Sequence, residues 1–325
     1  INTIRGTRVN NMNIIFGASG FIGSHLIKML GTDSINFDLI QKGKTSKLYD
    51  IRESIDRVEN NISVVFNLAA IHKTPGHKYH EYFETNINGA ENVCAFARLN
   101  KVKTIVFTSS IAPYAATEVE KTETVLPMPN TPYGISKLVA EEIHKRWQAE
   151  KSDERKLIIV RPGVVFGQNE GGNFTRLYRA MKSGRFFYPG RKDTKKAAIY
   201  VKDLVRLMVE MAEKEEPGVH IYNTVYAPCY TIEEICKTMA KVTDAKEPKL
   251  TVPAGVLKMA ASTIHLFGKV IGKSFDGIHP DRVKKLMVST NINGQKLLNH
   301  GYKMEYSLEE AISDWWNDCN QKGLY

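Results

Sequence analysis

A tyrosine and a lysine stand four positions apart in Tyr133-Gly134-Ile135-Ser136-Lys137, at the start of a helix predicted over 133–151. Residues four apart lie on one face of a helix, so the phenol and the ammonium can act on one group. A free tyrosine has a pKa of about 10, and a nearby positive charge lowers that pKa toward the range of a general base. Ser110, after a strand predicted over 104–108, is placed to hydrogen-bond the same substrate hydroxyl.

A glycine-rich turn provides the second candidate site. The segment Gly17-Ala18-Ser19-Gly20-Phe21-Ile22-Gly23 directly follows the β-prone run 13–16 and opens a helical apolar pattern. Glycines at this spacing let the backbone approach a pyrophosphate, which the amides and the positive dipole end of the helix hold. The residues that we expect to bind a dinucleotide here are Gly17, Ser19, Gly20, Phe21, Ile22 and Gly23.

Asp38 indicates which dinucleotide is preferred. It ends the second predicted strand, 21 positions after Gly17. This offset is close to the roughly 20 residues expected for a carboxylate that binds the adenosine ribose hydroxyls. A carboxylate at this place repels a 2′-phosphate, so it favours NAD over NADP, although Lys42 and Lys44 leave NADP open as the alternative.

In these motifs the sequence resembles the extended short-chain dehydrogenase/reductase superfamily. Within it, the sequence resembles the NAD-dependent sugar epimerase/dehydratase family, in particular its UDP-glucose 4-epimerase-like members. The resemblance covers nearly the whole chain. Besides the glycine-rich turn and the Tyr133–Lys137 segment, the matching segments are Asp50-Ile51-Arg52, Asn67-Leu68-Ala69-Ala70, Thr85-Asn86, Ser109-Ser110, Arg161-Pro162, and Tyr200-Val201 with Asp203.

The resemblance implies a larger cofactor site with three catalytic residues beside it. Asp50 and Ile51 would meet the adenine, and Lys137 would also hold the nicotinamide ribose. The other residues implied at the cofactor are Leu68, Ala69, Ala70, Asn86, Tyr133, Pro162 and Val164. The catalytic residues would be Ser110, Tyr133 and Lys137.

The residues after Ser110 narrow the reaction. Dehydratases of this family place an Asp-Glu pair there, because eliminating water needs an extra acid and base; this chain has Ile111-Ala112. That disfavours a 4,6-dehydratase and favours an epimerase of a nucleotide-diphosphate sugar, acting at C4 through a keto-sugar. Two alternatives stay open. One is an NAD(P)-dependent dehydrogenase or ketoreductase of a sugar or 3β-hydroxysteroid-like substrate, and the other is a non-catalytic NAD-binding protein.

The substrate residues are less well marked. The family's R-P-x-N-x-Y-G segment reads Arg161-Pro162-Gly163-Val164-Val165-Phe166-Gly167, so its asparagine is replaced by Val164. The family's phosphate-binding arginine aligns with Lys196, which can neutralise phosphate but lacks the planar fork. The loop 191–196 is therefore either a phosphate-facing loop or a solvated run of charges. The substrate candidates are His72, Asn173, Lys196 and Arg282.

The elements that must position these residues alternate between strand and helix. Strands are predicted over 34–37, 63–68, 104–108, 156–161 and 221–224, and helices over 81–100, 133–151, 232–242 and 308–316. This alternation predicts an α/β fold: a Rossmann doubly wound parallel sheet with a smaller, mostly helical substrate-binding lobe. We assign 12–165 to the NAD-binding domain, with 197–225 returning to it, and 166–196 with 226–325 to the substrate lobe. Residues 1–11 read as an extension or as expression-vector residues.

Composition sets the broad class. The chain has 325 residues, 42% hydrophobic and 25% charged, with a net charge of +10, and these values exclude disordered and fibrous proteins. Its four cysteines lack metal-ligand or C-x-x-C spacing, so we expect reduced thiols in a cytoplasmic protein and no metal.

Charge and hydropathy also limit the partners. The basic residues are scattered without a nucleic-acid-binding motif, so no nucleic-acid partner is expected. No apolar run reaches about 18 residues, so no membrane span is predicted. The segment 252–272 reads as a core or cleft-capping helix, with an interfacial helix for a lipid-linked sugar as the alternative. The family resemblance implies a homodimer.

Overall fold

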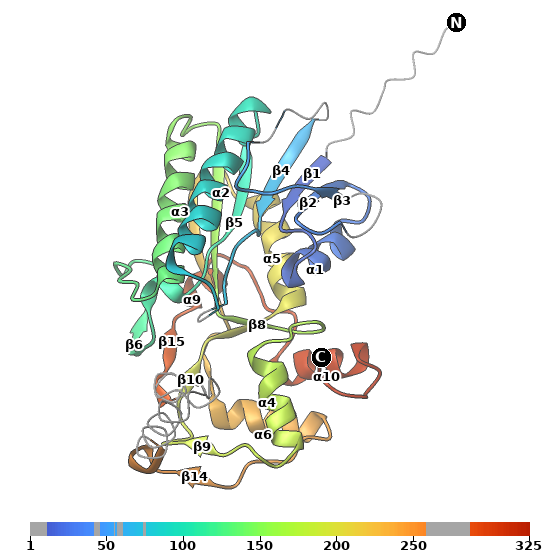
Figure 1. Cartoon of the computed structure of the whole chain (residues 1–325), viewed down its shortest axis with the longest axis vertical. Coiled ribbons are helices and arrows are strands. Elements are labelled where there is room, and N and C mark those ends of the chain that lie inside the picture. The colour runs from blue at the N-terminus through green and yellow to red at the C-terminus, as the bar shows by residue number, and fades with distance from the viewer. Residues whose placement is uncertain (1–11, 42–45, 55, 57–60, 74–75, 258–286) are drawn as a thin grey trace, which may run out of the picture. The chain divides into compact units, whose positions relative to one another are not determined.

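The computed structural model describes residues 12–41, 46–54, 56, 61–73, 76–257 and 287–325 (Figure 1). The chain divides into two compact units. Unit 1 comprises Ile1–Pro113, Pro127–Arg161 and Val205–Tyr222, and unit 2 comprises Tyr114–Leu126, Pro162–Leu204 and Asn223–Tyr325. The helix α5 (Val201–Lys214) begins in unit 2 and continues into unit 1.

A seven-stranded sheet forms the frame of unit 1, and its strand order is β12-β7-β5-β4-β1-β2-β3. The bounds are β1 (Met12–Phe16), β2 (Ser34–Asp38), β3 (Ser46–Leu48), β4 (Ile62–Asn67), β5 (Thr104–Thr108), β7 (Lys156–Pro162) and β12 (Gly218–Thr224). All pairs from β7 to β3 are parallel. The order reverses between β1 and β4, and in such sheets ligands bind at the carboxyl ends of the strands beside the reversal. The predicted doubly wound α/β fold is confirmed.

The central strands are buried on both faces, which explains why they read as continuous aliphatic runs. Ile14, Val65, Ile105 and Leu157 lie side by side across β1, β4, β5 and β7, and each is 0% exposed. The next residue of each strand is buried as well. A rigid sheet of this kind fixes the loops that follow its carboxyl ends.

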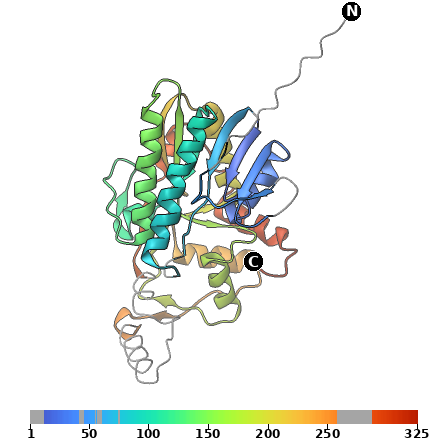
Figure 2. The same cartoon turned by 45° about the horizontal axis from the view of Figure 1, so that its top comes forward.

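Three helices of unit 1 bear on the candidate site: α1 (Phe21–Leu30), α2 (Tyr79–Leu99) and α3 (Pro132–Ala149). The helices α2 and α3 run side by side (Figures 1 and 2). The side chain of Thr131 caps α3 by accepting a hydrogen bond from the Gly134 amide at 3.1 Å. Pro132 occupies the first helical turn, where its missing N–H is tolerated. These two residues make α3 begin directly before Tyr133.

Unit 2 is built from short strands and helices. Its four-stranded sheet has the order β13-β10-β15-β6, and two further pairs are β11-β8 and β14-β9. The strands are β6 (Thr117–Lys121), β8 (Val164–Phe166), β9 (Tyr188–Pro189), β10 (Lys195–Lys196), β11 (Ala198–Tyr200), β13 (Tyr230–Thr231), β14 (Thr251–Val252) and β15 (Thr290–Ile292). The helices are α4 (Asn173–Lys182), α6 (Ile232–Val242), α9 (Gln295–Asn299) and α10 (Leu308–Asp318). Capping boxes begin α6 and α10, which pack together.

Several expectations concern membranes, metals and thiols. Within the described ranges, no helix combines the length and hydrophobicity needed to cross a bilayer. Residues 258–272 of the segment considered as an interfacial helix lie outside the described residues. The four cysteines are buried and free. In the part of the chain that is described, no three His, Cys, Asp or Glu side chains are grouped to hold a metal ion.

Candidate active site

The glycine-rich turn joins β1 to α1, and backbone packing explains its glycines. Gly17 has φ +80°, and a Cβ there would lie 2.7 Å from the Ala69 nitrogen. A Cβ on Gly23 would lie 2.3 Å from the Gly17 oxygen. Gly20 is the N-cap of α1, and no side chain among the described residues caps that helix. The turn therefore presents backbone amides at a helix N-terminus, an arrangement that fits a pyrophosphate.

Asp38 lies beside this turn, as expected for a residue that meets the adenosine ribose. Its Oδ2 accepts a hydrogen bond from the Ser19 amide at 2.7 Å. The Ser19 hydroxyl donates to the Ile40 oxygen at 2.6 Å, which ties the turn to the end of β2. The carboxylate is thus held next to the glycines, and its charge opposes a 2′-phosphate there.

The other residues implied at the cofactor differ in their surroundings. Leu68, Ala69 and Ala70 follow β4 and are partly buried, with Ala69 directly against Gly17. The guanidinium of Arg52 hydrogen-bonds Asp50 and lowers the pKa of that carboxyl. The side chain of Ile51 is 7% exposed and packs against Gly89 of α2. Ile51 is thus also a core residue, whereas the family resemblance implied only a contact with the adenine.

Ser110, Tyr133 and Lys137 come together at the carboxyl end of β5. The Ser110 hydroxyl hydrogen-bonds the phenol of Tyr133. The Lys137 side chain is buried, and its Nζ donates to the main-chain oxygen of Thr108 at 2.7 Å. The same Nζ lies 4.6 Å from the centre of the Phe107 ring, within the range of a cation–π contact. The helix and the strand end thus bring together the three groups expected to be catalytic.

Burial shifts the pKa of two of these groups in the protein alone. It raises the pKa of Tyr133 to about 12, and the hydrogen bond from Ser110 acts in the opposite direction. Burial also lowers the pKa of Lys137 to about 7, while the negative charge of Glu141 opposes that change. The phenol is therefore protonated near pH 7, and Lys137 titrates there. Further positive charge beside the phenol would be needed to make Tyr133 a base.

Asn86, implied at the cofactor site by the family resemblance, is buried and bonds to two elements. Its Oδ1 accepts from the Ile71 amide at 2.9 Å, and its Nδ2 donates to the Ile71 oxygen and to the Ser136 hydroxyl. Ser136 precedes Lys137 on α3. Asn86 therefore ties the loop after β4 to the helix that carries Tyr133 and Lys137.

A buried cluster beside these residues was missed from the sequence. Glu141 of α3 accepts hydrogen bonds from Ser109 and from Arg161 of β7, and all three side chains are buried. Glu141 stands four positions after Lys137, so helical spacing placed a carboxylate on the same face as the lysine. That spacing was the available signal, and the two partners become visible only in the folded sheet.

The remaining candidates are spread over both units. His72 follows β4 in unit 1 and is exposed. In unit 2, Asn173 begins α4 and its Oδ1 accepts from Arg176 at 2.9 Å. The Nζ of Lys196 in β10 donates to the Val288 oxygen at 2.9 Å, and burial lowers the pKa of Lys196 to about 8. Pro162 ends β7, and Val164 begins β8. Arg282 lies outside the described residues.

Charged side chains of the loop 191–196 form ion pairs and hydrogen bonds within unit 2. The guanidinium of Arg191 pairs with Glu118 and donates to the Ser289 hydroxyl at 3.0 Å. The Ser289 amide in turn donates to Glu118 at 2.9 Å. Arg191 is therefore tied to neighbouring strands, while 41% of its side chain stays exposed.

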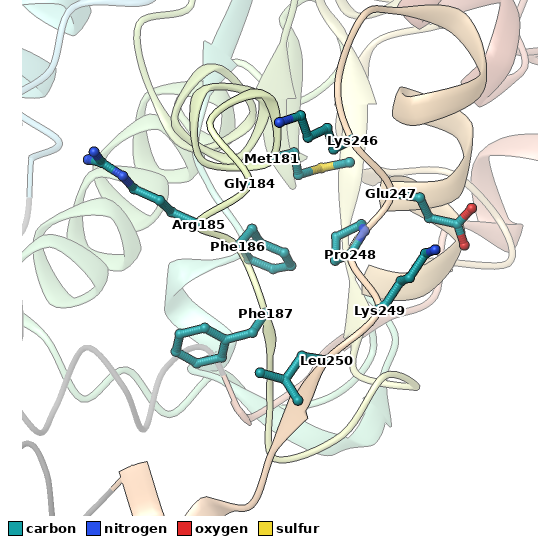
Figure 3. A pocket seen from close by; sticks show the side chains of 10 residues that line it. All are labelled: Met181, Gly184, Arg185, Phe186, Phe187, Lys246, Glu247, Pro248, Lys249 and Leu250. Carbon is teal, nitrogen blue, oxygen red and sulfur yellow. The ribbon is translucent and has the colours of Figure 1, made fainter.

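Unit 2 also contains a groove of about 310 Å³ between the end of α4 and the segment after α6 (Figure 3). None of the residues predicted for catalysis or cofactor binding lines it. Its lining residues are Met181, Gly184, Arg185, Phe186, Phe187, Lys246, Glu247, Pro248, Lys249 and Leu250. The groove combines apolar side chains with three cations and one carboxylate.

Comparison with known proteins decides the family. Residues 13–224 match the family described as the NAD dependent epimerase/dehydratase family. The chain belongs to this family. The match includes the glycine-rich turn, Asp38, Ser110, Tyr133 and Lys137, so the predicted family is confirmed.

Individual relatives extend over nearly the whole chain at low identity. One is the N-acetyl-α-D-glucosaminyl-diphospho-ditrans,octacis-undecaprenol 4-epimerase of Escherichia coli O157:H7, 27% identical over 94% of each chain. Another is a UDP-glucose 4-epimerase of Vibrio cholerae, 26% identical over 80% of this chain and 82% of the relative. A solved structure of MoeE5 in complex with UDP-glucuronic acid and NAD has a TM-score of 0.72. It is 22% identical, covers 95% of this chain and 100% of that chain, and supports the fold.

Proposed function

We propose that this chain is an NAD-dependent epimerase of a nucleotide-diphosphate sugar that acts at C4 through a transient keto-sugar. The grouping of Ser110, Tyr133 and Lys137 at the end of β5 carries the proposal. The residues after Ser110 are Ile111 and Ala112, and the Ala112 amide donates to the Ser110 hydroxyl at 3.1 Å. This segment therefore lacks the acid and base that elimination of water requires.

The proposed cofactor is NAD, and the residues of the turn fit it. Gly17 and Gly23 allow the close backbone packing of the turn, which presents the amides at the N-terminus of α1 to a pyrophosphate, and Asp38 is placed for the ribose. When bound, NAD would supply a reversible acceptor for the hydride of the sugar carbon. Pro162 and Val164 complete the residues proposed for cofactor binding.

The chain's own groups would handle the proton and hold the substrate. Tyr133 takes the proton from the C4 hydroxyl and returns one after the keto-sugar has turned over. Ser110 orients that hydroxyl through its own hydroxyl. Lys137 stands one helical turn after Tyr133 on α3, and its positive charge, together with that of an oxidised nicotinamide, would favour the phenolate. Candidates for the diphosphate and sugar are His72, Asn173, Lys196 and Arg282.

A substrate panel tests this function. Purified protein with NAD is incubated with UDP-, GDP- and dTDP-hexoses and UDP-N-acetylhexosamines, and the products are followed by proton NMR. We expect at least one pair of C4 epimers to interconvert to an equilibrium mixture. If every sugar in the panel remains unchanged, the nucleotide-sugar proposal is wrong.

A second candidate substrate is a sugar linked through diphosphate to a polyprenol. The relative from Escherichia coli O157:H7, which matches over nearly the whole chain, favours it. Both substrates present a sugar on a diphosphate, and they differ in the carrier. Equal concentrations of UDP-N-acetylglucosamine and detergent-dispersed undecaprenyl-diphospho-N-acetylglucosamine are therefore compared. Conversion of the lipid-linked sugar alone would replace the first candidate by the second.

We also propose that the protein works in the cytoplasm as a homodimer. The four free, buried thiols support a reducing compartment. The homodimer rests on family resemblance. Light scattering after size-exclusion chromatography measures the assembly, and a mass near 36.6 kDa would rule the dimer out.

A further inference from the structure

Glu141 forms a buried ion pair with Arg161, and both of its carboxylate oxygens accept hydrogen bonds. The Glu141 side chain is 0% exposed and that of Arg161 is 3% exposed. Glu141 Oε1 accepts from Ser109 Oγ at 2.5 Å and from Arg161 Nε at 2.9 Å. Its Oε2 accepts from Arg161 Nη2 at 2.5 Å. Burying two charges costs so much desolvation that a pair of this kind is weak support for stability alone.

The position of the cluster suggests another role. Ser109 directly precedes Ser110, and the Ser109 amide donates to the Val160 oxygen of β7 at 2.8 Å. Arg161 follows Val160, and Glu141 stands one turn after Lys137 on α3. Glu141 therefore joins the ends of β5 and β7 to the helix that carries Tyr133 and Lys137. All these residues belong to unit 1.

The charge of Glu141 also acts on Lys137. Burial lowers the pKa of Lys137 to about 7, and Glu141 is the charge that opposes this change. The charged or titratable groups around Lys137 come from several elements: Tyr133, Glu141 and His144 on α3, His72 after β4, and Arg161 on β7 through Glu141. Burial lowers the pKa of His144 to about 4, so this ring is neutral near pH 7. Among these groups, Glu141 supplies the negative charge that helps Lys137 keep its proton.

We propose that Glu141, held by Arg161 and Ser109, is a positioning residue that fixes Ser110 and the ammonium of Lys137. The importance of these two groups rests on the function proposed above. Glu141 does this through other residues: it bonds the neighbour of Ser110 on one side and lies one helical turn from Lys137 on the other.

Glu141→Gln tests the proposal because glutamine keeps the size of the side chain and removes its charge. Without that charge, Lys137 loses its proton at lower pH and supports the phenolate less well. We expect the rising limb of the kcat profile to move up by about one pH unit and kcat at pH 7 to fall about tenfold, with the KM of the sugar within about twofold. A role in folding alone would lower activity by the same factor at every pH, which would overturn the proposal.

A second readout needs neither cofactor nor substrate. The titration of Lys137 is followed by nitrogen-15 NMR in the cofactor-free protein, and its midpoint should fall by about one pH unit in Glu141→Gln. An unchanged midpoint would overturn the proposal even if the wild type were inactive. An inactive wild type with a shifted midpoint would instead count against the proposed function and leave the effect of Glu141 on Lys137 established.

Matched variants separate charge from fold. Glu150, at the end of α3, is also paired with arginines, Arg98 and Arg155. Glu150→Gln should leave the pH profile and the Lys137 midpoint unchanged, and an equal shift in this control would overturn the proposal. If Glu141→Gln does not fold, the double variant with Arg161→Met leaves no unpaired buried charge and should show the same shift of the midpoint.

Discussion

At the residue scale, burial of the charged Lys137 side chain lowers the stability of the fold, and its position at the candidate site explains why it is buried. Burial lowers the pKa of Lys137 from 10.5 to about 7. Between these values the unfolded chain binds more protons than the folded one, so this group makes stability rise with pH. We expect Lys137→Met to raise the free energy of unfolding by about 1–3 kcal/mol at pH 6, and the gain to vanish as the pH nears 10.5. Urea denaturation over this pH range measures it, and a gain that grows with pH would contradict the assignment.

The phenol of Tyr133 gives the second prediction at this scale. Tyr133→Phe keeps the ring and removes the proton carrier, so kcat should fall by about a thousandfold, as for loss of a general acid–base group. Binding of NAD should stay within about threefold of wild type. Tyr178→Phe is a matched control, because it removes a phenol that bonds Asp244 in unit 2 at 2.6 Å. Activity assays measure kcat, and calorimetry measures the binding of NAD. A fully active Tyr133→Phe variant would exclude the proposed role.

These residues also show what a sequence can reveal. Tyr133 and Lys137 were predictable because a helix alone brings residues four apart together. The bonds of Glu141 were not, because Ser109, directly after β5, lies 32 positions away and Arg161, on β7, lies 20 away. Their meeting depends on β5 and β7 being neighbours, which the order of the sheet decides.

At the element scale, the turn between β1 and α1 depends on backbone contact. In Gly23→Ala the new Cβ would lie 2.3 Å from the Gly17 oxygen and 2.6 Å from the Ala18 oxygen. The turn must shift, so we expect a loss of about 1–3 kcal/mol in stability and at least tenfold weaker NAD binding. Gly255→Ala is the control, because its Cβ would meet nothing within 4 Å. Thermal unfolding and calorimetry with NAD check both effects, and wild-type binding by Gly23→Ala would contradict this account of the turn.

The long elements were predictable, and the short ones were not. The strand predicted over 104–108 is observed with the same bounds as β5. The helix predicted over 133–151 is observed as α3, which begins one residue earlier, at Pro132, and ends two residues earlier, at Ala149. Their aliphatic runs and helical periodicity are local signals. Strands such as β10 and β15 contain two or three residues and form because a distant partner lies beside them. Thr290 of β15, for example, pairs with Thr117 of β6.

At the scale of the whole molecule, the reversal of strand order between β1 and β4 gathers the proposed cofactor residues. The glycine-rich turn follows β1, and Leu68, Ala69 and Ala70 follow β4, so distant segments meet at one edge. The alternation of strands and helices predicted this arrangement, because parallel strands require crossover helices. Unit 2 offered no comparable rule, and the substrate residues assigned to it remain predictions.

Recycling of the cofactor is the last property that belongs to the molecule as a whole. An epimerase returns the hydride to the sugar that gave it, so protein freed of NAD should lose activity and regain it with NAD. NADP should restore less than about a tenth as much, because Asp38 beside Ser19 repels the 2′-phosphate. Absorbance at 340 nm should show at most one NADH per active site while many sugars turn over. Accumulation of one NADH per product would instead identify a dehydrogenase. The product would then be lighter than the starting sugar by two hydrogens, whereas an epimer has the same mass.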